Sequence, residues 1–227
     1  MPGFSAACGV ALMVAALAGC SSAPPAATPL LQHAGERMSR LHGFHFAMQV
    51  TGATGTAEPV EAAAGDAHPP DLHALVDLRE GGFLVEVEVI FSGAAIYLKS
   101  ITGGWQRLTA SEVAQFFDPR SLFDPQLGLF KAMEETQGPT VGKKETVDGH
   151  DTYPVSGTLT GARMHQLLSL IRGEGSYHAT YWIESGANTL WRARLSGNLF
   201  DATRAAAVTF DFSKHDQPIS VTPPPLG

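Results

Sequence analysis

The chain has 227 residues, of which 44% are hydrophobic and 16% are charged, and its formal net charge is −7. An acidic protein does not attract the phosphates of nucleic acids or of anionic lipid headgroups, so we expect no nucleic-acid partner. The apolar fraction is sufficient for a hydrophobic core, and because charged residues fall below the average of about 25%, we expect apolar surface that must be covered.

The N-terminus carries an apolar run that ends in a cysteine. Residues 6–18 are small and mostly apolar, and the run is shorter than the roughly 20 residues of a transmembrane helix. It is typical of a secretory signal, and the tetrad Leu17-Ala18-Gly19-Cys20 resembles a bacterial lipobox. We predict a signal peptide at residues 1–19 and lipidation of Cys20. The signal lacks the usual Lys or Arg before its apolar run, and an ordinary cleavage site is the alternative.

The mature chain is expected to begin with a tether. Residues 20–28 contain only Cys, Ser, Ala, Pro and Thr, a composition typical of a flexible or extended spacer. Acyl chains on Cys20 would anchor the exported protein to the outer face of the cell membrane. The other cysteine, Cys8, lies within the predicted signal, so we expect no disulfide, no metal site and no cofactor.

Residues 29–227 are predicted to form one domain that begins with a helix and continues as a sheet. Thr28-Pro29 indicates the start of an amphipathic helix that ends at Gly43. Short turns such as Ser92-Gly93 indicate an antiparallel meander, whereas the Ala-rich residues 57–71 are expected to be irregular. Strands are predicted where apolar residues occupy every second position, at residues 44–50, 72–78, 83–91, 177–183, 191–196 and 208–212.

Three further helices are predicted in the middle of the chain. The first is short and runs from Ser111 through Phe117. The second begins at Asp124-Pro125 and ends at Gly138-Pro139, and the third runs from Thr160 to Gly173. A sheet with one apolar face must cover that face. The helix after Thr28-Pro29 and the two longer helices of the middle of the chain are amphipathic and are expected to lie over it.

No arrangement of residues predicts an enzyme. Glu86 and Glu88 lie two apart on one strand, as glycosidase carboxylates can, but solvated side chains on a polar face are the simpler interpretation. The nine histidines show no metal-ligand spacing, and the chain has neither a nucleophile elbow nor a phosphate-binding loop motif. Arg192 and Arg194 could meet a phosphate or sulfate headgroup, although an exposed strand face is favoured.

A family resemblance rests on the order of several segments. Besides the lipobox, these are residues 30–50, residues 95–99 with Gly103-Gly104-Trp105, residues 147–150 and residues 210–212. In this order the chain resembles the LppX/LprAFG family of mycobacterial lipoproteins over essentially its whole mature length, least well at residues 57–71. The resemblance implies an α+β fold similar to that of the Lol lipoprotein carriers. In that fold a strongly curved antiparallel sheet, or half-barrel, has helices over its concave apolar face, which holds acyl chains.

The sequence and the resemblance together predict a membrane-anchored lipoprotein. It would bind the acyl chains of lipids or glycolipids in an apolar cavity and hold or transfer them in the cell envelope, with an envelope transporter as a possible partner. The alternative is an interaction or sensor module that has a filled core and carries no lipid. The cavity wall is predicted from the inward faces and comprises Phe46, Met48, Val76, Val87, Val89, Leu127, Phe130, Leu167, Leu168, Ile171 and Tyr181.

Overall fold

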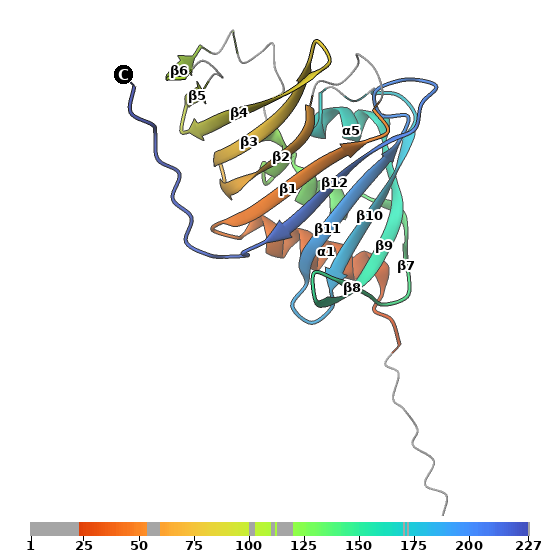
Figure 1. Cartoon of the computed structure of the whole chain (residues 1–227). Helices are drawn as coiled ribbons and strands as arrows, with labels where there is room; N and C mark the ends of the chain where they lie inside the picture. The colour runs from red at the N-terminus through yellow and green to blue at the C-terminus, as the bar shows by residue number, and fades with distance from the viewer. Residues whose placement is uncertain are drawn as a thin grey trace, which may run out of the picture.

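The computed structural model describes residues 23–53, 60–99, 103–109, 112, 120–169, 171 and 173–226. Within these ranges twelve strands form one sheet in the order β6-β5-β4-β3-β2-β1-β12-β11-β10-β9-β7, with β8 paired to β9 (Figure 1). The strands are β1 (Phe44–Thr51), β2 (Val60–His68), β3 (Asp71–Glu80), β4 (Phe83–Ser92), β5 (Ala95–Lys99), β6 (Trp105–Leu108), β7 (Gln137–Val141), β8 (Glu145–Val147), β9 (His150–Thr160), β10 (Ser176–Glu184), β11 (Thr189–Gly197) and β12 (Ala206–Ser213).

The sheet is antiparallel, strongly curved and open, with β6 and β7 at its two edges. The helices lie on one side, behind the strands in Figure 1, and are α1 (Ala27–Ser39), α3 (Arg120–Phe123), α4 (Leu129–Glu134) and α5 (Gly161–Leu167). Helix α1 packs against α4 and contacts β7 and β11, while α5 contacts β9 and β10. The predicted α+β fold, a curved antiparallel sheet with helices over its concave face, is confirmed.

The six segments predicted as strands form β1, β3, β4, β10, β11 and β12. The prediction of an irregular segment at residues 57–71 is wrong, because β2 occupies most of it and pairs with both β1 and β3. Alanine and glycine have low strand propensity, but small residues suit this position. A Cβ placed on Gly65 would collide with the backbone of His73 and Ala74 on the neighbouring strand.

The predicted helices are longer than the observed ones. Helix α1 begins at Ala27, inside the predicted tether, and ends at Ser39, so both expected ends are wrong. Thr160 does start α5, since its Oγ1 accepts a hydrogen bond from Arg163 N at 3.3 Å, but the helix ends at Leu167 and does not reach Gly173.

The helix expected from Asp124 to Gly138-Pro139 is confined to α4, which begins after Gly128. The Asp124 carboxylate accepts hydrogen bonds from the backbone of Gln126 and Leu127, both at 2.8 Å, and so forms a turn before the helix. The residues at the other end of the prediction belong to strand β7.

Two predicted features fall outside the described residues. The first is the signal peptide together with Cys20. The second is the short helix expected at residues 111–117, of which only Glu112 is described. Helix α3 was not predicted. No helix in the described part of the chain has the length and apolar character needed to cross a membrane.

Candidate functional site

The concave face of the sheet carries an uninterrupted set of apolar side chains. Directly opposite residues in an antiparallel sheet point to the same face. One row of such residues crosses seven strands from β4 to β10, and consists of Val87, Val76, Ala63, Met48, Phe210, Ala193 and Tyr181.

One half of this face is filled. Phe210, Ala193 and Tyr181, at the β12–β10 end of the row, are completely buried. The main helix contacts with the sheet are also at this end, on β7, β9, β10 and β11. The strands β9 to β12 and the helices over them therefore form an ordinary close-packed core, which we call the filled half.

The other half of the face, on β3 to β5, is open. Four of its inward side chains are buried, namely Leu72, Ala74, Phe91 and Ile96. Six further apolar ones are only half-buried, and they are Val76, Leu78, Val85, Val87, Val89 and Leu98. We call these six residues the open stripe. An apolar surface of this kind prefers an aliphatic ligand to water.

A cluster of phenylalanines lies between the two halves. The Phe44 ring centroid on β1 is 5.0 Å from that of Phe123 on α3, 5.6 Å from Phe130 on α4 and 5.7 Å from Phe212 on β12. All three pairs are edge-to-face, the arrangement that aromatic quadrupoles favour. The cluster fixes α3 and α4 over β1, and the open stripe begins beyond it.

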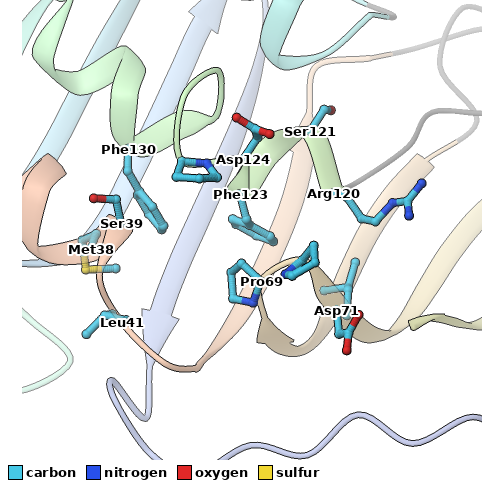
Figure 2. Close-up of a pocket in the computed structure, with 13 residues that line it drawn as sticks. Met38, Ser39, Leu41, Pro69, Asp71, Arg120, Ser121, Phe123, Asp124 and Phe130 are labelled. Atoms are coloured by element: carbon cyan, nitrogen blue, oxygen red, sulfur yellow. The ribbon is translucent and has the colours of Figure 1, made fainter. Parts of the chain in front are cut away.

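A cavity of about 610 Å³ adjoins this cluster at the β2–β3 turn. Figure 2 shows Met38 and Leu41 on one side, Pro69 and Asp71 on the other, and Phe123 above Pro69. The remaining lining residues are Ser39, Pro70, Leu72, Arg120, Ser121, Asp124, Pro125 and Phe130. Its volume lies within the range of small-molecule sites, about 300 to 1,000 Å³.

The charged groups at the mouth of the cavity contribute to its structure. Asp71 Oδ1 accepts a hydrogen bond from Gly93 N at 2.7 Å, and Arg120 Nη1 donates to Gly93 O at 3.2 Å. The Arg120 guanidinium also lies 5.2 Å from the centroid of the Phe91 ring. Asp71 and Arg120 thus hold the β4–β5 turn at the rim of the cavity.

A buried polar group stabilises the filled half. Arg163 on α5 donates from Nη1 to Leu127 O at 2.7 Å and from Nη2 to Gly128 O at 3.2 Å, which ties α5 to the loop before α4. Its Nε lies 2.6 Å from Glu135 Oε2 as an ion pair without hydrogen-bond geometry. Burial raises the pKa of the Tyr181 phenol, which lies 3.3 Å from Thr136 Oγ1 and stays neutral.

The predicted wall residues fall into three environments. Phe46, Met48, Phe130, Leu167, Leu168, Ile171 and Tyr181 are buried, whereas Val76, Val87 and Val89 are half-buried. The inward orientation expected for Leu127 is wrong, because its side chain is 53% exposed in the turn before α4. Only Phe130 of the predicted set lines the 610 Å³ cavity.

Several residues around the cavity were not identified from the sequence. Phe123 and Arg120 belong to a single helical turn, which is too short to produce a periodic pattern. Pro69 and Pro70 lie in the segment that was expected to be irregular. A Pro-Pro pair between two apolar segments is a turn signal that could have located this rim.

The charged residues considered for catalysis or headgroup binding lie on the convex face and are mostly paired. Glu88 binds Lys99 Nζ at 3.0 Å and His73 Nε2 at 2.9 Å, and Arg192 Nε is 2.5 Å from Asp211 Oδ1. Among the described residues, no group of three His, Cys, Asp or Glu side chains could hold a metal ion.

Known proteins resemble the chain in sequence. The sequence profile of the LppX_LprAFG lipoprotein family matches residues 26–221. LprF of Mycobacterium bovis, named as a diacylated glycolipid transporter, is 25% identical over 205 residues, which cover 79% of this chain and 77% of LprF. LprG of Mycobacterium leprae, named as a lipoarabinomannan carrier protein, is 23% identical over 223 residues, which cover 92% of this chain and 90% of LprG.

Solved structures show the same fold. Crystalline LprF from Mycobacterium bovis superposes with a TM-score of 0.72 at 22% identity, covering 88% of this chain and 97% of that one. LppX from Mycobacterium tuberculosis superposes with a TM-score of 0.63 at 19% identity, covering 86% and 97%.

Proposed function

Because its residues 26–221 match the family profile, the chain belongs to the LppX_LprAFG lipoprotein family, and on that premise we propose that it binds the acyl chains of lipids or glycolipids. It would hold them or transfer them within the cell envelope. The names of its relatives support this proposal, since LprF is named as a glycolipid transporter and LprG as a lipoarabinomannan carrier.

The observation that carries the proposal is the division of the concave face. A module with a completely filled core would cover all of its inward side chains with helices. Here Val76, Val87 and Val89 stay half-buried while the other end of the same face is fully packed. The open stripe and the nearby 610 Å³ cavity therefore offer apolar surface to a ligand.

The hydrophobic effect supplies enough free energy for such binding. Burial of one CH₂ group contributes about 0.8 kcal/mol, so an acyl chain of some fourteen carbons contributes roughly 11 kcal/mol before the costs of association. Binding of this kind requires no catalytic residue. We accordingly propose a carrier and not an enzyme.

We also propose that Cys20 carries the lipid anchor. The lipobox-like tetrad that precedes it and the membership in a lipoprotein family support this assignment. The anchor would keep the domain on the outer face of the cell membrane, within reach of the bilayer that holds its ligands. An envelope transporter that supplies or receives the lipid is a possible partner.

The proposal is tested by identifying bound lipid. Residues 23–226 contain every described element of the core, so the chain can be produced from Ser21 without an anchor and purified without detergent. We expect mass spectrometry of an organic extract to find acyl lipids or glycolipids. If the protein is empty, and added phospholipid neither binds nor raises its thermal unfolding midpoint, the interaction or sensor module is the better interpretation.

A further inference from the structure

The hairpin between β3 and β4 ends in two exposed apolar side chains. Phe83 is 76% exposed and Leu84 is 58% exposed, and Phe83 has the greatest exposure among the large apolar residues of the described chain. Large apolar side chains at such exposure are unfavourable in water. Phe83 and Leu84 are successive residues of β4, so they extend from opposite faces of the same hairpin tip.

The tip projects away from the rest of the described structure. Gly81 and Gly82 form the turn with φ of +57° and +89°, a conformation that glycine adopts without strain. No described atom lies within 4 Å of a Cβ placed on either glycine. Figure 1 shows the β3–β4 hairpin at the top of the sheet, at the opposite end from the start of α1.

The exposed tip is continuous with the open stripe. Phe83, Val85, Val87, Val89 and Phe91 occupy alternate positions of β4 and therefore share its concave face. Their burial increases along the strand, from Phe83 at 76% exposure through the half-buried valines to Phe91 at 4%. At a rise of about 3.4 Å per residue this apolar row is roughly 27 Å long.

The row ends beside the cavity described above. Phe91 is directly opposite Leu72, which lines the 610 Å³ cavity. An acyl chain that enters at Phe83 would therefore follow apolar side chains along β4 towards the interior, with Glu80 of β3 directly opposite Phe83 at the entrance. The exposed end of the row is the place where such a chain would leave its source.

We propose that the β3–β4 hairpin tip, through Phe83 and Leu84, docks on the surface of a lipid bilayer. Docking would bring the open stripe within reach of the acyl chains of that bilayer. This inference rests on the proposed function, because it names the surface from which the lipid is taken or to which it is delivered. Phe and Leu are side chains that enter the boundary between headgroups and acyl chains.

The charges around the tip determine which kind of bilayer contact is involved. Asp77, Glu80 and Glu86 are acidic, while the nearby Arg79 is paired with Glu61. This acidic neighbourhood does not attract anionic headgroups. The contact is driven by apolar insertion, so it does not require anionic lipid.

The test measures flotation of the chain from Ser21 with phosphatidylcholine vesicles. We expect the protein to float with the vesicles, and the double variant Phe83→Ser with Leu84→Ser to lower the partition coefficient about tenfold or more. Leu127→Ser with Leu226→Ser is the matched control, because those side chains are exposed to a similar degree, 53% and 52%, at other places. The control should float like the unaltered protein.

A second measurement separates docking from lipid binding itself. Lysophosphatidylcholine below its critical micelle concentration should bind the tip variant and the unaltered chain equally, because no bilayer is involved. Equal flotation of the tip variant and the unaltered chain, no flotation of either, or stronger flotation on phosphatidylglycerol would overturn the docking proposal alone. Failure of the unaltered chain to bind lysophosphatidylcholine would overturn the proposed function together with it.

Discussion

Val87 and Leu167 both belong to the predicted cavity wall, yet their surroundings differ. Leu167 on α5 is completely buried in the filled half, whereas Val87 is half-buried in the open stripe. A larger side chain at position 167 meets packed atoms on all sides. At position 87, which is only half-buried, we expect it to extend over the uncovered part of the concave face. The same substitution at the two positions therefore separates packing from binding.

We expect Leu167→Trp to lower the free energy of unfolding by about 1 to 3 kcal/mol through overpacking. Val87→Trp should leave the urea unfolding curve nearly unchanged but reduce loading with phospholipid, since the indole occupies part of the apolar surface. Leu75→Trp is the control for Val87→Trp, because Leu75 is 43% exposed on the convex face of the adjacent strand. Unimpaired loading of Val87→Trp would mean that the open stripe is not the binding surface.

At the scale of elements, the outer strands of the open half are held together by a cross-strand ion-pair group. The Glu88 carboxylate on β4 binds Lys99 on β5 at 3.0 Å and His73 on β3 at 2.9 Å. The hydrogen bond from Lys99, followed by that from His73, lowers the pKa of Glu88 below its ordinary value of 4.5. Ionised Glu88 thus joins three strands on which the helices make few contacts.

This pKa shift predicts how stability depends on pH. A carboxylate with a lowered pKa in the folded state contributes its full stabilisation above the ordinary pKa and loses it as the pH falls through the lowered value. Urea unfolding of Glu88→Gln should therefore show a deficit against the unaltered protein at pH 6 that shrinks below about pH 4.5.

A matched control for Glu88→Gln is Glu86→Gln on the same strand face. Glu86 is directly opposite Asp77, and no ion pair to it is found among the described residues. Its neutralisation should not produce a deficit, because it relieves a like-charge neighbour. A deficit of Glu88→Gln that persists unchanged at pH 3 would show that the carboxylate charge is not what stabilises these strands.

The elements also show what the sequence could predict and why the remainder could not be predicted. Segments such as β4, with its alternating valines, were recognised because one face is apolar along the whole strand. Strand β2 was missed because it contains four alanines and a glycine but only one β-branched residue, and its structure depends on pairing with β1 and β3. The helix predicted to reach Gly138-Pro139 is longer than the observed α4, which ends at Glu134. Apolar spacing alone does not show where a helix ends and the next strand begins.

The candidate site was predictable only in part. Alternation assigns Val76 and Val87 to the inward face, and that assignment agrees with the register. Whether an inward residue is covered depends on where the helices lie, which no local pattern contains. Phe130 was identified from its helix, whereas Phe123 became a neighbour of the cavity only through the fold.

At the scale of the whole molecule, the two halves of the sheet differ in how completely their concave faces are covered. The filled half, with α1, α4 and α5, supplies most of the completely buried side chains. The open half contains the open stripe and leads from the exposed hairpin tip to the cavity near the β2–β3 turn. A stable half can thus hold a binding face that remains uncovered without a ligand, which is the arrangement a carrier of acyl chains requires.

The central claim is that acyl chains bind on the open half, and photo-crosslinking tests it most directly. A phosphatidylcholine with a diazirine in one acyl chain would be bound to the chain from Ser21, illuminated, and the labelled peptides identified by mass spectrometry. We expect labels on Val76, Leu78, Val85, Val87 and Val89 that an excess of unlabelled lipid removes. Labels confined to the convex face, or labelling that excess lipid does not reduce, would contradict the claim.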